Sequence, residues 1–156
     1  EVLHAPEVVE GAVPEVKQEP APIVVQDVLL EVCRARGYDV ACAKTLLGML
    51  WKESLGVSKA VGDRGNARGW YQIWVKLHKI SLECAEDLRC SSDWTISYLE
   101  SNSYPRYVAY AVQCHNGCNA GNGYAASTRR HGERLWRTPL IINGDGNATL
   151  NTLAVK

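Results

Sequence analysis

Hydrophobic residues recur at helical spacing along most of the chain after residue 26. Apolar residues between positions 28 and 32 share one face of a first helix, which we expect to begin near Asp27 and to end at Gly37. A second helix follows Asp39, whose carboxylate suits a helix start, and ends near Glu53. Its wide apolar stripe comprises Ala43, Leu46, Leu47, Leu50 and Trp51. The second helix is therefore predicted to have a broad apolar face.

Three further helices are predicted in the second half of the chain. One lies around residues 94–99, with Ser91 or Ser92 as its cap. The next contains Pro105 in its first turn, a position where proline is favoured. The last covers residues 124–136. Helices therefore account for most of the predicted regular structure.

The segments between these helices contain many turn-forming residues. Residues 55–68 read as a loop, with room for a short hairpin near 60–70. Residues 69–80 are predicted to form a helix, or a turn followed by a helix. Since no stretch predicts a larger sheet, the expected fold class is mainly α.

Composition divides the chain into three parts. Residues 1–26 hold four of the six prolines and many Glu and Val residues, which predicts an extended tether. An edge strand, or docking of this segment on the domain, is the alternative. Residues 27–138 form the expected domain, and residues 139–156 a turn-rich, peripheral tail. The 17 basic and 17 acidic side chains cancel, so no nucleic acid partner is expected.

The six cysteines fall into three close pairs, which are Cys33 with Cys42, Cys84 with Cys90, and Cys114 with Cys118. We expect each pair to form a disulfide, although sequence alone does not select a connectivity. The alternatives are unpaired thiols and a zinc site made by the last four cysteines with His115, but no pair has the tight C-x2-C spacing typical of zinc. Disulfides would place the chain in an oxidising compartment.

Glu53 stands at the predicted end of the second helix, behind Trp51. The negative end of the helix dipole disfavours an ionised carboxylate, and apolar neighbours such as Leu55 add a desolvation cost. Both effects raise the pKa towards the range in which a carboxylic acid can donate a proton at neutral pH. A solvated helix end is the structural alternative.

Three motifs in order resemble the goose-type lysozymes and the related soluble lytic transglycosylases. They are Glu-Ser at 53–54 followed by a Gly-rich loop with "GDRGN", then "RGWYQI" at 68–73, and "CHNGC" at 114–118. The resemblance covers roughly residues 40–135. It implies a lysozyme-like fold over residues 27–138, with the Gly-rich loop or a short hairpin beside the cleft.

The resemblance also implies roles for individual residues. Glu53 matches the general acid that protonates the glycosidic oxygen, and Asp63 matches a carboxylate that helps to hold the attacking water. The candidate substrate-binding residues are Ser54, Trp70, Tyr71, Gln72, His115, Asn116 and Tyr124. No metal or cofactor is expected.

Two positions depart from the family pattern. Trp74 occupies the position of a second aspartate in goose-type enzymes, and His115 replaces a tyrosine of the third motif. Without the second aspartate, only Asp63 could activate water for hydrolysis. We therefore favour a lytic transglycosylase, in which Glu53 acts first as acid and then as base and leaves a 1,6-anhydro end.

The expected substrate is peptidoglycan, cut at the β-1,4 bond between N-acetylmuramic acid and N-acetylglucosamine. The alternatives are a goose-type hydrolase that uses Asp63, and an inactive glycan-binding module. We expect an extracytoplasmic monomer, in the periplasm, in the cell envelope or secreted. The segment 1–26 is a candidate tether to an envelope or virion assembly.

Overall fold

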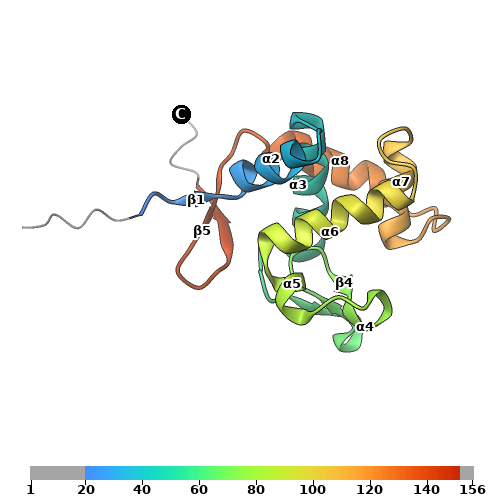
Figure 1. Ribbon diagram of the computed structural model, residues 1–156, viewed down its shortest axis with the longest axis horizontal. Helices are drawn as coiled ribbons and strands as arrows, with labels where there is room; N and C mark the ends of the chain where they lie inside the picture. The colour runs from blue at the N-terminus through green and yellow to red at the C-terminus, as the bar shows by residue number, and fades with distance from the viewer. Residues whose placement is uncertain (1–19, 152–156) are drawn as a thin grey trace, which may run out of the picture.

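The computed structural model describes residues 20–151 and is mainly helical (Figure 1). Within this range there are seven α-helices and two small antiparallel sheets. The helices are α2 (Val25–Ala35), α3 (Val40–Ser54), α4 (Val75–His78), α5 (Leu82–Glu86), α6 (Leu88–Ser101), α7 (Val108–Asn116) and α8 (Tyr124–Leu135). The predicted mainly α class is therefore confirmed.

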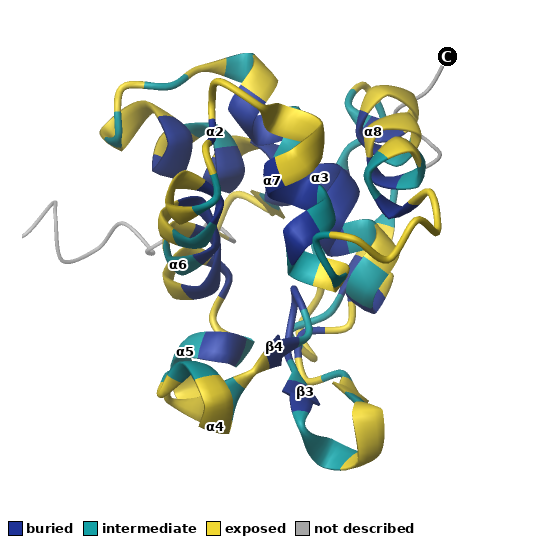
Figure 2. Cartoon of the chain, turned by 90° about the vertical axis from the view of Figure 1, so that its right-hand side faces the viewer, coloured by how far each residue is buried: buried dark blue, intermediate teal, exposed yellow. Residues whose placement is uncertain are grey.

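Helix α3 is the central element of the helical body. It packs against α8 and α2 and carries fully buried residues on several of its faces, as Figure 2 shows. Its buried apolar residues are Cys42, Ala43, Leu46, Leu47, Met49 and Leu50. Burial of these side chains stabilises the domain by roughly 1.5–3 kcal/mol for each large residue. The apolar stripe read from the sequence is thus the core of the fold.

Two glycines bring α3 and α8 into close antiparallel contact. A Cβ atom on Gly48 would overlap the carbonyl oxygen of Thr128, and one on Gly132 would overlap that of Lys44. Because neither glycine has a side chain, the two backbones can touch at this crossing. The crossing sets the start of α8 against the end of α3, where Glu53 lies.

Two helix starts differ from the sequence prediction. Helix α6 begins at Leu88, and the Asp87 carboxylate caps it by accepting from the Cys90 N–H at 2.7 Å. Ser91 and Ser92 are fully buried inside this helix and do not cap it. Pro105 does not lie in the first turn of α7, because that helix begins only at Val108.

A three-stranded sheet lies beside the helical body. It contains β2 (Val61–Gly62), β3 (Ala67–Arg68) and β4 (Ile73–Trp74), with a short 3-10 turn at Asp63–Gly65. Together with α4 and α5 it forms the small lobe below the helices in Figure 2. The hairpin predicted near 60–70 is confirmed, and the segment 69–80 is a turn and a short strand followed by the single-turn helix α4.

The second sheet was not predicted from the sequence. Strand β1 (Ile23–Val24) pairs with β5 (Leu140–Ile142), and β5 pairs with β6 (Ala148–Leu150). The segment expected to be a peripheral tail therefore enters the core, where Leu140 and Ala148 are buried. Its strands are too short for a clear alternation, which explains the difference.

The end of the expected tether is also part of the fold. Ile23 and Val24 form the edge strand β1, in agreement with the alternative reading, while residues 1–19 lie outside the described range. The buried Gln26 side chain donates to the carbonyls of Leu135 and Thr138 and accepts from the Leu140 N–H. This one side chain ties α2 to the end of α8 and to β5.

All six cysteines form the three local disulfides that the sequence predicts. The thiolates that the alternative zinc site requires are therefore used in covalent bonds.

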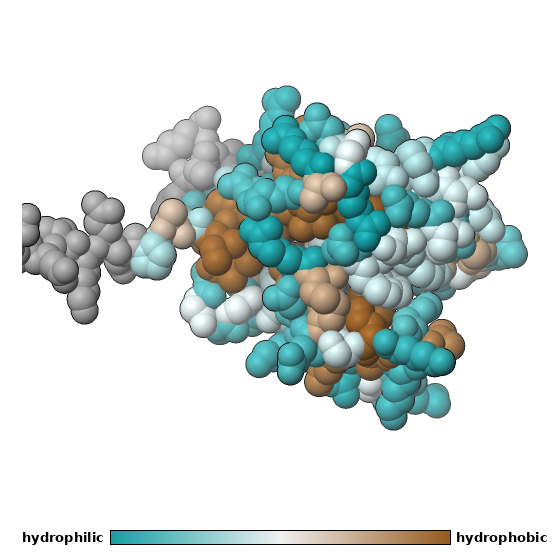
Figure 3. All heavy atoms as spheres, in the orientation of Figure 1, coloured by the Kyte–Doolittle hydropathy of each residue, from teal (hydrophilic) through white to brown (hydrophobic). Residues whose placement is uncertain are grey.

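No helix in residues 20–151 has the length and apolar character needed to cross a bilayer. Apolar surface gathers over the β1–β5–β6 sheet and over the small lobe (Figure 3). Exposed apolar residues in these regions include Ile23, Val61, Trp74, Leu77 and Leu82.

Candidate active site

Glu53 is a largely buried carboxylate in the last turn of α3. Its side chain retains 17% of its accessible surface. Oε2 accepts a hydrogen bond from the Tyr124 hydroxyl at the start of α8, and it lies 3.8 Å from Nε2 of His115 on α7. Three helices thus meet at one carboxylate. The structural alternative of a solvated helix end does not describe this residue.

Burial raises the pKa of Glu53 above its ordinary value. The nearby His115 and the hydrogen bond from Tyr124 oppose this shift, while the negative charge of Asp63 adds to it. The net direction is upward because desolvation of the carboxylate is the largest effect. A raised pKa leaves more of Glu53 in the protonated form that can donate a proton.

His115 is a buried, hydrogen-bonded histidine that also lies beside Glu53. Its side chain is 8% exposed, and Nε2 donates to the Tyr71 carbonyl at 2.7 Å. A carbonyl oxygen only accepts, so Nε2 carries a proton in this arrangement. The turn at residues 69–72 therefore fixes the ring that faces Glu53.

Asp63 lies on the hairpin turn of the small lobe, outside the helical body. Its backbone is left-handed at φ 47°, and so is that of Arg64 at φ 59°. The carboxylate is exposed, and Oδ2 accepts a hydrogen bond from the Trp74 indole N–H at 3.0 Å. Asp63 is close enough to Glu53 for its charge to act on that carboxyl. The two predicted carboxylates thus interact through their charges.

Among the predicted substrate-binding residues, Ser54, Trp70 and Tyr71 are buried, as is Tyr124. The Trp70 indole donates to the Glu86 carbonyl, and the Tyr71 hydroxyl is hydrogen-bonded to Ser92. The Ser54 hydroxyl donates to the Leu50 carbonyl in its own helix. All three are packed inside the protein and present no free face to a sugar. Their role in substrate binding stays a prediction, and in the structure their side chains contribute to the packing of the protein interior.

The Gln72 side chain links two backbone segments of the small lobe by hydrogen bonds. Its amide nitrogen donates to the carbonyls of Ala60 and Gly69 at 3.0 and 3.1 Å. Its backbone is left-handed at φ 53°, which turns the chain from the 69–72 segment into β4. Both amide protons are thus donated to backbone carbonyls within the protein, and the role of Gln72 in substrate binding stays a prediction.

Asn116 is exposed at the end of α7. Its Oδ1 accepts from the Asn122 amide at 2.6 Å, and Oδ1 of Asn122 accepts in turn from Gln113. Oδ1 of Asn122 also accepts from the Tyr124 N–H at 3.2 Å. This chain of amides orders the loop before α8 and so helps to hold Tyr124 against Glu53.

A row of aromatic side chains, which the sequence analysis did not single out, extends from His115. Tyr98 lies edge-on to His115 at 5.9 Å and stacks on Trp94 at 5.4 Å. His78 contacts both Trp94 and Tyr98. Trp94 and Tyr98 are four residues apart on α6, a spacing that puts them on one helix face. From that spacing the sequence could have predicted an aromatic face on this helix.

The loop after Glu53 is held by the C-terminal sheet. Gly56 accepts from the Ala148 N–H at 2.8 Å, and the Asn147 carboxamide oxygen accepts from the Ser58 N–H at 2.9 Å. Gly56 has a left-handed φ of 84°, and a Cβ there would meet the Ala148 backbone. The sheet β1–β5–β6 therefore fixes the chain that leaves the candidate acid.

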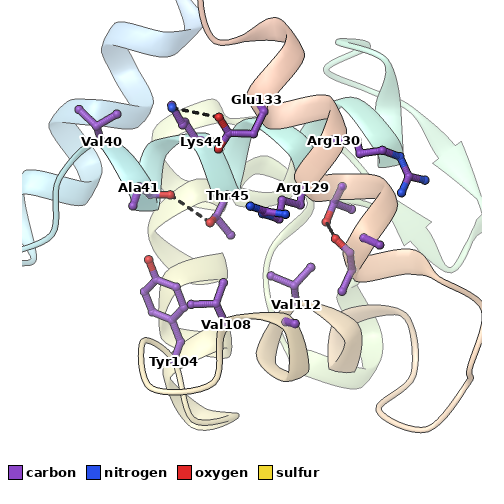
Figure 4. A pocket seen from close by; sticks show the side chains of 14 residues that line it. Val40, Ala41, Lys44, Thr45, Tyr104, Val108, Val112, Arg129, Arg130 and Glu133 are labelled. Carbon is purple, nitrogen blue, oxygen red and sulfur yellow. Dashed lines mark hydrogen bonds and ion pairs between the residues drawn. The ribbon is translucent and has the colours of Figure 1, made fainter.

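A pocket of about 1020 Å³ lies between α3, α7 and α8 (Figure 4). Apolar residues of all three helices line it, with Arg129 pointing into the space and the Lys44–Glu133 ion pair at its edge. It contains none of the predicted catalytic residues.

Within residues 20–151, no group of three or more His, Cys, Asp or Glu side chains is arranged to hold a metal ion.

No protein-family model, curated protein or solved structure matches the chain. Its function is therefore argued from the residues and the geometry described above.

Proposed function

We propose that the chain is a peptidoglycan-cleaving enzyme with a lysozyme-like fold. It acts on the β-1,4 bond between N-acetylmuramic acid and N-acetylglucosamine, with Glu53 as the proton donor. One observation carries the proposal, namely that Glu53 is a buried carboxylate with a raised pKa at the junction of three helices. Burying such a group costs stability, and perturbed carboxylates of this kind cluster at catalytic sites.

The surroundings of Glu53 support a role as acid and then as base. Protonated Glu53 gives its proton to the glycosidic oxygen as the bond to the anomeric carbon breaks. Tyr124 donates to Oε2 and stabilises the carboxylate that remains. That carboxylate then takes the proton of the 6-hydroxyl of the same sugar as its oxygen attacks the anomeric carbon. The products are a free hydroxyl and a 1,6-anhydro end, and Glu53 is again protonated.

Hydrolysis at the same site is the second candidate. Two observations favour it, namely the hydrogen bond from Trp74 to the Asp63 carboxylate and the effect of the Asp63 charge on the pKa of Glu53. In this outcome water attacks the anomeric carbon, and Asp63 accepts its proton. The three disulfides support an extracytoplasmic location, which is where peptidoglycan lies.

The test is the release of soluble fragments from purified peptidoglycan by the Glu53→Gln variant. Glutamine keeps the size of the side chain and can accept from Tyr124, but it cannot deliver a proton. We expect the rate to fall by at least about 100-fold with the fold preserved. Glu83→Gln changes an exposed glutamate on α5 and is the matched control, with a rate near that of the wild type. A Glu53→Gln variant with near-native activity would refute the proposal.

A further inference from the structure

Trp74 lies on β4, and its indole N–H donates a hydrogen bond to the Asp63 carboxylate. We propose that Trp74 is a positioning residue that holds the Asp63 carboxylate for the attack of water on the glycosyl unit. The inference rests on the proposed function, and it concerns which nucleophile completes the reaction. Trp74 and Asp63 together would promote the formation of reducing ends. This reaction would compete with the formation of 1,6-anhydro ends, which requires Glu53 alone.

The sheet register explains why these two residues meet. Trp74 on β4 pairs with Ala67 on β3, and Ala67 pairs with Gly62 on β2. Trp74 is therefore in line across the sheet with the residue immediately before Asp63. The two intervening residues are small, which leaves room for the indole to reach the hairpin turn. The resulting distance between Nε1 of Trp74 and Oδ2 of Asp63 is 3.0 Å.

The backbone of the turn is the second observation. Asp63 and Arg64 are consecutive non-glycine residues with left-handed φ values of 47° and 59°. Such conformations cost of order 1 kcal/mol or more each and persist only where surrounding contacts fix them. The Trp74 hydrogen bond is the side-chain contact that holds Asp63 there. The small lobe therefore keeps one carboxylate in a strained but defined position.

The chemistry of the pair suits a water-activating role. An indole N–H only donates, so Trp74 cannot itself act as a base. It occupies Oδ2 of Asp63 and leaves Oδ1 to accept a proton from water. As the water oxygen bonds to the anomeric carbon, the bond to the leaving sugar breaks and that sugar takes the proton of Glu53. The proton on Asp63 then returns to solvent, and Glu53 regains one.

The experiment measures reducing ends and 1,6-anhydro ends separately by mass spectrometry of peptidoglycan digests. The proteins are the wild type, Trp74→Phe, Asp63→Asn and the double variant. Phenylalanine keeps an aromatic ring but removes the N–H. Trp136→Phe is the control for loss of an indole, because Trp136 lies at the end of α8, away from the hairpin. Thermal melting of each variant reports any general loss of stability.

We expect Trp74→Phe to lower the rate of reducing-end formation about fivefold, and Asp63→Asn to lower it at least about tenfold. The rate of anhydro-end formation should stay within about twofold. Because Trp74 acts through Asp63, its substitution should add nothing in the Asp63→Asn background.

Three results would overturn the inference alone while leaving glycan cleavage intact. The first is that the wild type forms only anhydro ends. The second is that Trp74→Phe forms reducing ends at the wild-type rate. The third is that the double variant loses as much reducing-end formation as the product of the two single effects. A wild type that cleaves no glycan overturns the inference and the proposed function together.

Discussion

Replacement of Gly48 by alanine tests the crossing of α3 and α8 on which the site depends. Helix propensity alone predicts that this change stabilises the protein by about 1 kcal/mol. The structure predicts the opposite, because the new Cβ would overlap the Thr128 carbonyl oxygen and lie 2.8 Å from its carbon. Those atoms belong to the backbone of α8 and cannot rotate away, so the helices must separate.

The size of the effect follows from the contact. Carbon atoms pack at roughly 3.5–4.0 Å, so α3 and α8 must move apart by about 1 Å. Overpacking of this kind costs up to about 3 kcal/mol. The same movement weakens the hydrogen bond from Tyr124 to Glu53, which adds about 1 kcal/mol and cancels the gain in helix propensity. We expect a net loss of about 3 kcal/mol, which lowers the Tm by about 6–12 °C.

The assay is thermal unfolding followed by circular dichroism or calorimetry. Gly144→Ala is the matched control, because a Cβ at Gly144 meets no atom within 4 Å and that glycine has no left-handed φ. Its stability should change by less than about 0.5 kcal/mol. A Gly48→Ala protein that melts at or above the wild-type temperature would show that the two helices do not cross in this way.

Three further predictions follow from the site and the disulfides. Glu53 has a raised pKa in the folded state, so the unfolded state releases this proton at lower pH and stability falls as pH rises from about 4 through the folded pKa. The Tm of Glu53→Gln should therefore rise relative to that of the wild type as pH increases from about 4, and an unchanged difference would contradict the shift. Tyr124→Phe removes a hydrogen bond that lowers the pKa of Glu53, so the alkaline limb of the pH profile of kcat/KM should move to higher pH. The control is Tyr110→Phe, which alters an exposed tyrosine and should leave the alkaline limb where it is. Full reduction should add about six daltons to the intact mass and lower the Tm by several degrees, and labelling of three or more thiols in the denatured, unreduced protein would contradict the disulfides.

Local patterns in the sequence predicted the helical body well. The apolar stripe of α3 and the segment Tyr124–Leu135 of α8 have the periodicity of buried and half-buried helices. The end of α3 near Glu53 was predicted because Gly56 follows it. The cysteine pairs are close in sequence, so local pairing was the simplest expectation, and the structure has it.

Features that depend on distant contacts could not be predicted in the same way. The sheet β1–β5–β6 joins residues more than a hundred positions apart through strands of two or three residues, which carry little periodic signal. The hydrogen bond from Trp74 to Asp63 depends on the register of three short strands. Trp70 and Tyr71 match a motif of the resembled families, but that match does not say that both side chains are buried.

The central claim is that Glu53 cleaves the glycan strand of peptidoglycan. Mass spectrometry of soluble products from purified peptidoglycan tests it most directly, because it identifies which bond is cut and which end is left. The wild type should release disaccharide-containing fragments that end at N-acetylmuramic acid, with anhydro ends lighter than reducing ends by one water. The Glu53→Gln variant should release almost none. Products cut only in the peptide, or equal release by both proteins, would contradict the account.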